Sequence, residues 1–378
     1  MEDAAKKHKM LPFWALIIID ALGICAGLGV YLLFDYVMPH RLDVKTEVVA
    51  EVDSDKSFEL PSDSSAAGDA DSEAEPAESI SEHDLGRAKR PSLRGDSEPE
   101  REDGKRNLSN QYTYNVDSDE DEFERILDAS TSIELLGHGR TDNADVSVYK
   151  KSVLDGDEKI TYFIADVYVS NAGDILTAFA EDTYGKNIKD TVYNMAEENN
   201  ALFAVNGDYY GNAENGIVIR NGVKYRDTIN DADVLVLYTD GVMRAYHPEE
   251  FDMDKVLEQG AWQAWNFGPS LLDGKGGLNP TFNTTSYLNS KNPRSAAGYV
   301  EPGHYVFTTV DGRDRGYSSG ATLSELAAIL AKEGCVYAYN LDGGKSAMMY
   351  FDGRILNLPD GGGRDMSDII YVEKQEGE

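Results

Sequence analysis

The stretch CVYAYNLDGGKSAMMYF, residues 335–351, places a polar turn with two glycines between two apolar runs. The run ahead of the turn is typical of a buried strand, and the run behind it begins a hairpin. Glycines beside Lys-Ser are also typical of a loop that cradles phosphate. A Walker loop would need a glycine five positions before Gly344, where this chain has Tyr339. We therefore expect a strand, a turn and a second strand here, and no nucleotide cofactor.

Strand patterns of the same kind recur on both sides of this stretch. Residues 159–171 alternate between apolar and polar side chains, and residues 216–227 and 233–246 have the pattern of hairpins with Asn-Gly and Asp-Gly turns. Helical spacing occurs in three segments, at 187–200, 249–260 and 321–332. Because strands outnumber helices and hairpins dominate, the sequence predicts one α+β domain with a mixed or antiparallel sheet. We place this domain at residues 123–378, with its core at 150–373.

The N-terminal third of the chain has a different composition. Residues 1–10 are basic, and residues 11–34 are apolar apart from Asp20, which is long enough for a transmembrane helix. Basic residues ahead of such a span predict a cytoplasmic N-terminus and an extracellular domain. Residues 41–121 are rich in Asp, Glu and Ser, so they bury too little apolar surface to offset the entropy of ordering. We expect them to form a disordered acidic stalk between the membrane and the domain.

Charge and cysteine content narrow the class of protein. The formal net charge of −33 excludes a general nucleic-acid binder, which needs an excess of Lys and Arg. Cys335 is the only cysteine outside the predicted span, so the domain has no intrachain disulfide. An extracellular domain without disulfides is typical of bacterial surface proteins.

Two known catalytic patterns do not fit this chain. Residues 316–320, GYSSG, match the nucleophile elbow of serine hydrolases, in which a histidine follows the serine. The last histidine here is His304, which precedes Ser318. The histidines also lack the paired spacing of a zinc site, so we expect no zinc. A calcium site formed by Asp and Asn oxygens stays open, because calcium needs no compact motif.

Polar residues follow two of the predicted buried strands at the point where each strand ends. Asn206 and Asp208 follow ALFAV, and Asn340 and Asp342 follow VYAY. Asn, Asp and Gly are ordinary turn residues, which would explain either pair alone. Two pairs, each fixed by a strand, indicate a shared site whose carboxylates could act on a glycosidic bond. Basic residues in glycine-rich loops indicate an anionic ligand; they are Arg294, Arg313, Lys345 and Arg364.

Several motifs follow one another along the chain: VNGDYYG, GIVIRNGVKYRD, WNFGPSLLDGKG, NPRSAAGY, VDGRDRGYSSGATLSELA, NLDGGKSAMMYF and RDMSDIIYV. Together, over about residues 150–373, they resemble the phosphodiester glycosidase domain family. The resemblance implies hydrolysis of a sugar-1-phosphodiester, such as N-acetylglucosamine-1-phosphodiester, on its glycosidic side. This reaction frees the sugar and leaves a phosphomonoester. The implied substrate is a phosphodiester-linked glycan of the cell surface, and no cofactor is implied.

On this resemblance, Asp342 is the general acid/base or the nucleophile, and Asp208 is its partner. Arg294 and Arg313 would hold the phosphate, with Asn206 and Asn340 orienting the carboxylates. The remaining expected contacts are Asp311, Gly343, Gly344, Lys345, Ser346 and Arg364. Lys345 stands where the family often has glycine. The alternative is a module without catalytic activity that binds anionic wall polysaccharide or exopolysaccharide through the same basic residues.

Overall fold

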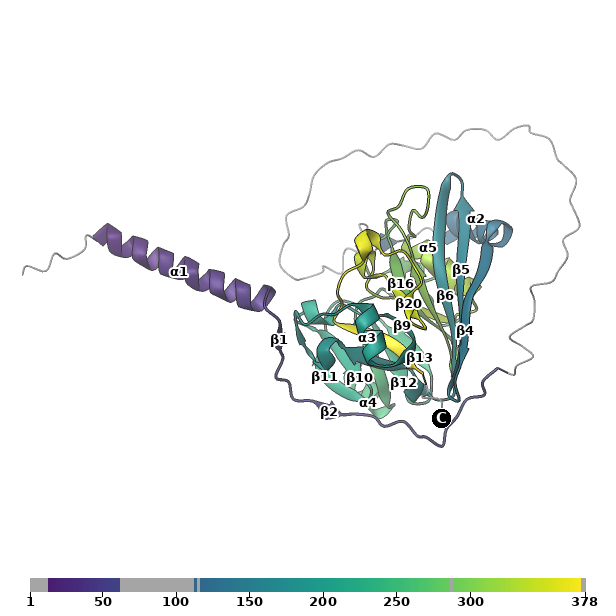
Figure 1. Cartoon of the computed structure of the whole chain (residues 1–378), viewed down its shortest axis with the longest axis horizontal. Coiled ribbons are helices and arrows are strands. Elements are labelled where there is room, and N and C mark those ends of the chain that lie inside the picture. The colour runs from purple at the N-terminus through teal and green to yellow at the C-terminus, as the bar shows by residue number, and fades with distance from the viewer. Residues whose placement is uncertain (1–12, 62–111, 114–115, 286–287, 375–378) are drawn as a thin grey trace, which may run out of the picture.

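The computed structural model describes residues 13–61, 112–113, 116–285 and 288–374 (Figure 1). Within these residues the strands form three larger sheets and two short strand pairs. Each pair of neighbouring strands that the structure describes is antiparallel. The expected strand-rich α+β domain with few helices is confirmed.

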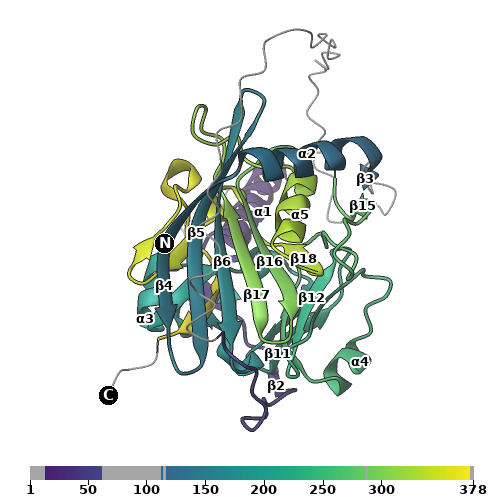
Figure 2. The ribbon, with the colours of Figure 1, turned by 90° about the vertical axis from the view of Figure 1, so that its right-hand side faces the viewer.

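The first six-stranded sheet has the order β18-β16-β17-β6-β5-β4. Its strands are β4 (Ser132–Arg140), β5 (Ala144–Asp155), β6 (Glu158–Val169), β16 (Arg294–Glu301), β17 (His304–Val310) and β18 (Tyr337–Asn340). One face of this sheet is covered by α2 (Val116–Ser130) and α5 (Leu323–Lys332), which lie side by side in Figure 2. The strand expected at 159–171 is β6.

The other two sheets pack against the opposite face of the first, in one core that joins all three. The second six-stranded sheet has the order β13-β12-β14-β10-β11-β2, and the five-stranded sheet has the order β20-β19-β9-β21-β7. The second sheet contains β2 (Glu47–Val48), β10 (Gly216–Arg220), β11 (Val223–Thr228), β12 (Val234–Tyr238), β13 (Met243–Tyr246) and β14 (Ala261–Trp265). The five-stranded sheet contains β7 (Leu176–Phe179), β9 (Ala201–Asn206), β19 (Met349–Phe351), β20 (Arg354–Ile355) and β21 (Asp368–Glu373).

Both predicted hairpins are present, because their turns are fixed locally. Asn221 and Gly222, between β10 and β11, have φ values of 51° and 72°, which is the conformation that an Asn-Gly hairpin turn requires. Gly241 closes the turn between β12 and β13 with φ of 83°. The remaining short strands and turns are β3 (Tyr112–Thr113), β8 (Gly185–Lys186), β15 (Thr281–Phe282), η2 (Ala172–Asp174), η3 (Ala180–Asp182), η4 (Tyr210–Asn212), η5 (Gly344–Ser346) and η6 (Asp360–Gly362).

Three helices of the domain, α3, α4 and α5, begin at capping residues. Thr322 and Glu325 form a capping box at the start of α5, so the helix expected at 321–332 is confirmed. The other two are shorter than predicted. α3 (Val192–Glu198) begins after its N-cap Thr191, and α4 (Met253–Glu258) begins after its N-cap Asp252. These caps end the extended backbone that precedes each helix.

The N-terminal helix α1 (Phe13–Tyr36) extends away from the sheets in Figure 1. Within the part of the chain that the structure describes, no helix is both long enough and apolar enough to span a membrane. The transmembrane helix expected over residues 11–34 is therefore not supported. The expected cytoplasmic tail, residues 1–10, lies outside the described residues.

The first part of the expected stalk packs on the domain instead. β1 (His40–Arg41) pairs with β8, and β2 pairs with β11. Further along, the Phe58 amide donates to the Ser170 oxygen at 2.6 Å. The prediction of a disordered stalk is wrong for residues 41–61, because their strands pair through the main chain and apolar side chains such as Leu42, Val44 and Val49 pack on the domain. We call residues 40–61 the N-terminal segment. The rest of the expected stalk up to residue 111 lies outside the described residues.

Four strand ends meet near one another in this fold. β9 ends at Asn206 and β18 ends at Asn340, whereas β16 begins at Arg294 and β21 begins at Asp368. In the antiparallel pairing, Asn340 lies opposite the third residue of β16, and Asn206 lies opposite the second residue of β21. The register therefore gathers the polar residues at the ends of these strands.

Candidate functional site

The two Asn-Xaa-Asp turns lie together, as expected for a shared site. The side-chain amide of Asn206 donates to the main-chain oxygen of Asp342 at 2.8 Å. Its oxygen accepts from the Ser295 hydroxyl at 2.7 Å and from the Met348 amide at 3.3 Å. Asn206 is fully buried, so its hydrogen bonds fix the turn that carries Asp342.

The Asp342 carboxylate is buried and held by three donors. Oδ1 accepts from the Gly343 amide at 2.9 Å, and Oδ2 accepts from the Ser346 hydroxyl and from Arg364 Nη2, each at 2.7 Å. Arg364 Nε also donates to the Ser346 hydroxyl at 2.6 Å. Burial raises the pKa of Asp342 above its ordinary value, although Arg364 and Ser346 act in the opposite direction. The site thus holds a carboxyl group that takes up a proton more readily than a surface aspartate.

Asp342 forms part of the wall of a cavity of about 150 Å³, which we call the cationic cavity. Its polar lining residues are Thr284, Asn292, Arg294, Arg313, Asn340, Asp342, Gly343 and Gly344. Its apolar lining comes from residues such as Phe267, Pro269 and Leu323. The structure therefore brings both predicted phosphate-binding arginines to the same cavity as Asp342.

Arg294 is a buried cation that is held by main-chain oxygens. Its Nε donates to the Ala321 oxygen at 3.0 Å, and its Nη2 donates to the Leu288 and Ser290 oxygens, the latter at 2.7 Å. It makes no ion pair with any residue in the described parts of the chain. Burial lowers the pKa of Arg294 to about 10, and the nearby charge of Arg313 acts in the same direction. A buried guanidinium without a carboxylate partner is suited to an anionic ligand.

Arg313 lies at a more open position of the same cavity. Its side chain is 45% exposed, and Nη1 lies 2.8 Å from Asp360 Oδ2. Nη2 donates to Asn292 Oδ1 at 2.8 Å. A Cβ on Gly344 would lie 3.5 Å from this guanidinium, and a Cβ on Gly343 would lie 2.7 Å from the Pro293 oxygen. The two glycines therefore let the turn approach the loop that carries Arg294.

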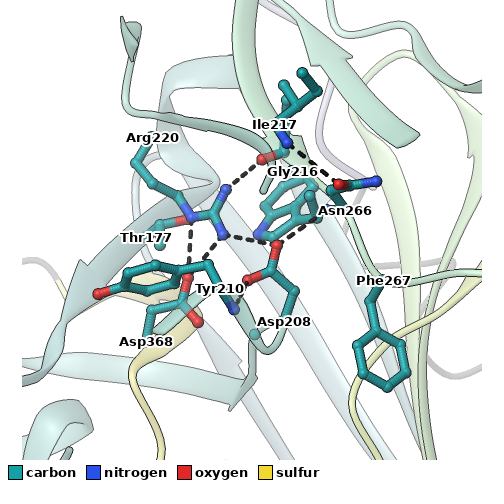
Figure 3. Close-up of polar contacts among 12 residues, drawn as sticks. Thr177, Asp208, Tyr210, Gly216, Ile217, Arg220, Asn266, Phe267 and Asp368 are labelled. Carbon is teal, nitrogen blue, oxygen red and sulfur yellow. Dashed lines mark hydrogen bonds and ion pairs between the residues drawn. The ribbon is translucent and has the colours of Figure 1, made fainter. Parts of the chain in front are cut away.

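Asp208 belongs to a buried group of three residues with Arg220 and Asp368 (Figure 3). Asp208 accepts from the Tyr210 and Asn266 amides, each at 3.0 Å. Arg220 Nη2 lies 3.1 Å from Asp208 Oδ2 and 2.9 Å from Asp368 Oδ2. Burial raises the pKa of Asp368 to about 7, with Arg220 lowering it and the charge of Asp208 raising it. Here two buried carboxylates share one buried guanidinium.

Asp208 and Asp342 both line a second, small cavity of about 20 Å³. Lys189, Tyr209 and Arg364 also contribute to its wall. Asp342 thus borders both cavities, whereas Asp208 borders the small one and not the cationic one. The two aspartates lie at the same small cavity, as expected. In addition, Asp208 forms an ion pair with Arg220.

The predicted contacts Asp311 and Lys345 are not among the residues that line either cavity. The Asp311 carboxylate accepts from the Asn357 side chain at 2.8 Å, from the Tyr317 hydroxyl at 2.9 Å and from the Leu358 amide at 3.0 Å. It anchors a neighbouring loop. Lys345 is exposed and lies beside Gly361. Its position next to Gly344 in the chain indicated a site residue, but the backbone turn directs it away from both cavities.

The structure also adds residues that the sequence did not indicate. Lys189 donates to the Asn212 side chain at 3.0 Å in the small cavity. Burial lowers the pKa of Lys189, and the charge of Arg364 adds to this effect. Arg220 and Asp368 belong to segments with the sequence pattern of strands. Because the two residues are far apart in the sequence, their ion pair could not be predicted from either segment. Ser318, from the GYSSG pattern, is buried and donates to the Asp311 main-chain oxygen at 2.6 Å.

No group of three or more His, Cys, Asp or Glu side chains that could hold a metal ion occurs within the described ranges.

Comparison with known proteins finds similarity in the C-terminal part of the chain. Residues 199–373 match a family model described as phosphodiester glycosidase. An uncharacterized SPbeta prophage-derived protein, YomE, of Bacillus subtilis (strain 168) is 32% identical over 196 residues, which are 50% of this chain. The match spans 30% of that relative's length.

One solved structure supports the fold, and a second is reported beside it. The catalytic domain of zebrafish N-acetylglucosamine-1-phosphodiester alpha-N-acetylglucosaminidase, auto-inhibited by its pro-peptide, aligns with a TM-score of 0.51 at 18% identity. The alignment covers 65% of this chain and 89% of that domain. A hypothetical protein from Synechocystis aligns with a TM-score of 0.43 at 16% identity, covering 64% of this chain and 63% of that one.

Proposed function

We propose that this chain, whose residues 199–373 match the phosphodiester glycosidase family, hydrolyses the bond between a sugar and the phosphate of a sugar-1-phosphodiester. One observation carries the proposal beyond the family match. Asp342, with its raised pKa, borders the cavity in which Arg294 is buried with no acidic partner among the residues that the structure describes. A carboxyl group for the sugar carbon and a cation for the phosphate therefore lie at one site.

The cations suit the phosphate of the substrate. A buried guanidinium favours a ligand that brings the missing negative charge. Arg294 is oriented by main-chain oxygens on one side, which leaves its remaining donor capacity for the cavity that it lines. Arg313 adds a second guanidinium at the same cavity. Together they would stabilise the charge that collects on the phosphate as the glycosidic bond breaks.

The atoms of the reaction balance with water as the second substrate. The bond between the anomeric carbon and the phosphate oxygen breaks, and its electron pair stays on the phosphate. The oxygen of water forms the new bond to carbon, either directly or after attack by a carboxylate. Because a phosphomonoester has a second pKa of about 6, it departs as an anion near neutral pH with little help from an acid. The carboxyl group is therefore needed mainly to accept the proton of water or to attack the carbon.

Asp342 is assigned this role because it borders the cationic cavity and has a raised pKa. Ser346 and Arg364 orient its carboxylate through Oδ2. Asp208 is assigned as the expected partner through the small cavity, in a positioning role that depends on its bond to Arg220. The origin of the substrate in a cell-surface glycan, and the extracellular location, stay predictions from the sequence.

The proposal is tested with the full chain and a panel of methyl phosphodiesters of N-acetylglucosamine 1-phosphate and glucose 1-phosphate, in both anomeric forms. We expect the appearance of free reducing sugar together with methyl phosphate. Asp342→Asn should lower the rate by at least a hundredfold, in the range of a lost general base or nucleophile. The exposed Asp254→Asn in α4 is the matched control and should keep the wild-type rate.

Two results would speak against hydrolysis by this site. Release of sugar at an unchanged rate by Asp342→Asn would remove this residue from the chemistry. Tight binding of the phosphodiesters without any release of sugar would favour the alternative, a module that binds anionic polysaccharide.

A further inference from the structure

Arg313, the more exposed arginine of the cationic cavity, already has an anionic partner. Its Nη1 lies 2.8 Å from Asp360 Oδ2, and its Nη2 donates to Asn292 Oδ1 at 2.8 Å. Arg294, in contrast, is held by main-chain oxygens. A phosphate that enters the cavity therefore meets one guanidinium to which a carboxylate of the protein is bound.

The loop that carries Asp360 contains three successive glycines. We call residues 359–363 the glycine loop. Gly361, Gly362 and Gly363 have φ values of 62°, 84° and 86°, and a Cβ on Gly362 would meet no atom within 4 Å. Glycine adopts positive and negative φ values about equally well. The backbone next to Asp360 can therefore change its conformation without the steric limits of other residues.

The residues on either side of the glycine loop are fixed to the domain. On one side, the Leu358 amide donates to Asp311 Oδ2 at 3.0 Å. On the other, Arg364 Nη2 donates to Asp342 Oδ2 at 2.7 Å. A movement of the glycine loop would thus leave these two contacts in place.

A second cation lies beside the glycine loop. A Cβ on Gly361 would lie 3.4 Å from Lys345 Nζ. Lys345 is exposed and is not among the residues that line the cationic or the small cavity. Because Gly361 follows Asp360 in the chain, the ammonium group is within reach of the Asp360 carboxylate. Asp360 therefore has two neighbouring cations, Arg313 at the cavity and Lys345 outside it.

A bound phosphate and Asp360 require the same guanidinium. Arginine binds phosphate most effectively through two parallel N–H groups, and Nη1 and Nη2 of Arg313 each have an oxygen partner already. If Asp360 stayed in place, two anions would lie next to each other on one cation, and their repulsion would weaken the binding of phosphate. Transfer of Asp360 to Lys345 would remove this repulsion and keep the carboxylate paired.

We infer that Asp360 competes with the substrate phosphate for Arg313, and that it moves to Lys345 when the phosphate binds. The identity of the anion as a substrate phosphate rests on the proposed function, whereas the competition applies to any phosphate in the cavity. Lys345 acts here through Asp360, as a positioning residue. The apparent affinity for phosphate is then the intrinsic affinity multiplied by the fraction of molecules in which Arg313 is free.

The test measures the affinity of the full chain for inorganic phosphate by calorimetry at an ionic strength of about 0.15 M. Asp360→Asn should bind phosphate more tightly by roughly 3- to 30-fold, as expected if Asp360 occupies Arg313 most of the time. If Asp360 only held the loop in shape, its loss would weaken binding instead. Asp314→Asn is the matched control, because it removes an exposed carboxylate next to Arg313 in the chain. It should change the affinity by less than about twofold, since exposed charges are screened by salt.

Lys345→Gln tests where the displaced carboxylate goes. In a chain that retains Asp360, this substitution should weaken phosphate binding by roughly 2- to 5-fold, the usual range for a lost exposed ion pair. In Asp360→Asn, the same substitution should leave the affinity unchanged. An equal loss in both backgrounds would show that Lys345 acts on the phosphate independently of Asp360, and would overturn the transfer.

The competition and the proposed hydrolysis can fail separately. Weaker or unchanged phosphate binding by Asp360→Asn, or no binding by either protein, would overturn the competition. Tighter binding by Asp360→Asn without release of sugar from any phosphodiester would contradict the hydrolysis and leave the competition standing. Hydrolysis together with an unchanged phosphate affinity in Asp360→Asn would do the reverse.

Discussion

The side-chain amide of Asn206 and the main-chain oxygen of Asp342 form a hydrogen bond of 2.8 Å that joins two sheets. Asn206 ends β9 in the five-stranded sheet, and Asp342 follows β18 in the first six-stranded sheet. The position of the proposed catalytic carboxylate therefore depends on a residue from another sheet. Several variants can test this dependence and the roles of other residues in the site and the domain.

Asn206→Ala is expected to impair both folding and catalysis. It leaves the Asp342 oxygen and the Ser295 hydroxyl without their buried partner, which should lower the free energy of unfolding by about 1–3 kcal/mol. The misplaced Asp342 should lower kcat more than it raises KM. Urea denaturation and steady-state kinetics measure the two effects. Asn143→Ala, at an exposed loop, is the control, and an unchanged kcat for Asn206→Ala would contradict the positioning role.

Arg294→Lys should weaken substrate binding although it keeps the positive charge. Lysine lacks the planar fork that donates to the Ala321 and Ser290 oxygens while lining the cavity. We expect KM to rise about tenfold or more, a loss comparable to one charge-assisted hydrogen bond. Arg354→Lys, which changes an exposed arginine, should keep the wild-type KM. Equal KM values for all three proteins would show that Arg294 does not bind the phosphate.

Ser346→Ala should shift the pH dependence of the reaction. The Ser346 hydroxyl lowers the pKa of Asp342 by donating to its charged form. Without this donor the pKa rises further, so Asp342 stays protonated to a higher pH. If Asp342 acts as base or nucleophile, the acid limb of the kcat/KM profile moves to higher pH. The control is Ser324→Ala in α5, whose profile should match the wild type. A shift of the limb to lower pH would contradict the assignment.

Asp368→Asn should make stability less dependent on pH. The pKa of Asp368 is raised to about 7 mainly by burial, against about 3.9 in an unfolded chain. Between these values the folded protein binds more protons than the unfolded one, so this group lowers stability as pH rises through that window. The fall in Tm from pH 5 to pH 8 should therefore be smaller in Asp368→Asn than in the wild type. Asp254→Asn serves as control, and an identical fall in all three proteins would place the pKa of Asp368 near its ordinary value.

Phe58→Ala should show that the N-terminal segment belongs to the domain. The Phe58 ring packs over the backbone of Gly241 and Gly303, so its loss removes buried apolar area. We expect the free energy of unfolding to fall by about 1–3 kcal/mol. Leu154→Ala, at a side chain that is 58% exposed, should change it by less than about 0.5 kcal/mol. No change for Phe58→Ala would indicate that the segment contributes nothing to stability.

Local signals in the sequence predicted much of this fold. The Asn221–Gly222 turn, the capping box of α5 and the alternation in β6 are each determined by a few adjacent residues. The two Asn-Xaa-Asp turns were predictable for a related reason. A buried strand fixes where its last residue lies, so the polar residue that follows is placed by the strand.

Features that depend on distant partners were not predictable. Asp311 has the sequence context of a site residue, but Asn357 and Tyr317 hold its carboxylate elsewhere. Arg220 and Asp368 form an ion pair between two different sheets. The sequence around either residue does not indicate that the other is its partner. The N-terminal segment docks through main-chain pairing and a few apolar side chains, such as Val49 and Phe58, whose partners lie far away in the sequence.

The docking of the N-terminal segment restricts how far the domain can travel from α1. The helix ends at Tyr36 and β1 begins at His40, so the connection spans at most about 14 Å, at roughly 3.4 Å for each extended residue. A free tether of some eighty residues would let the domain sample a wide volume around its point of attachment. Because β1 is paired with β8, immobilising α1 would also keep the domain and its cationic cavity close to the point of attachment. Substrates would then have to come within that short distance of α1.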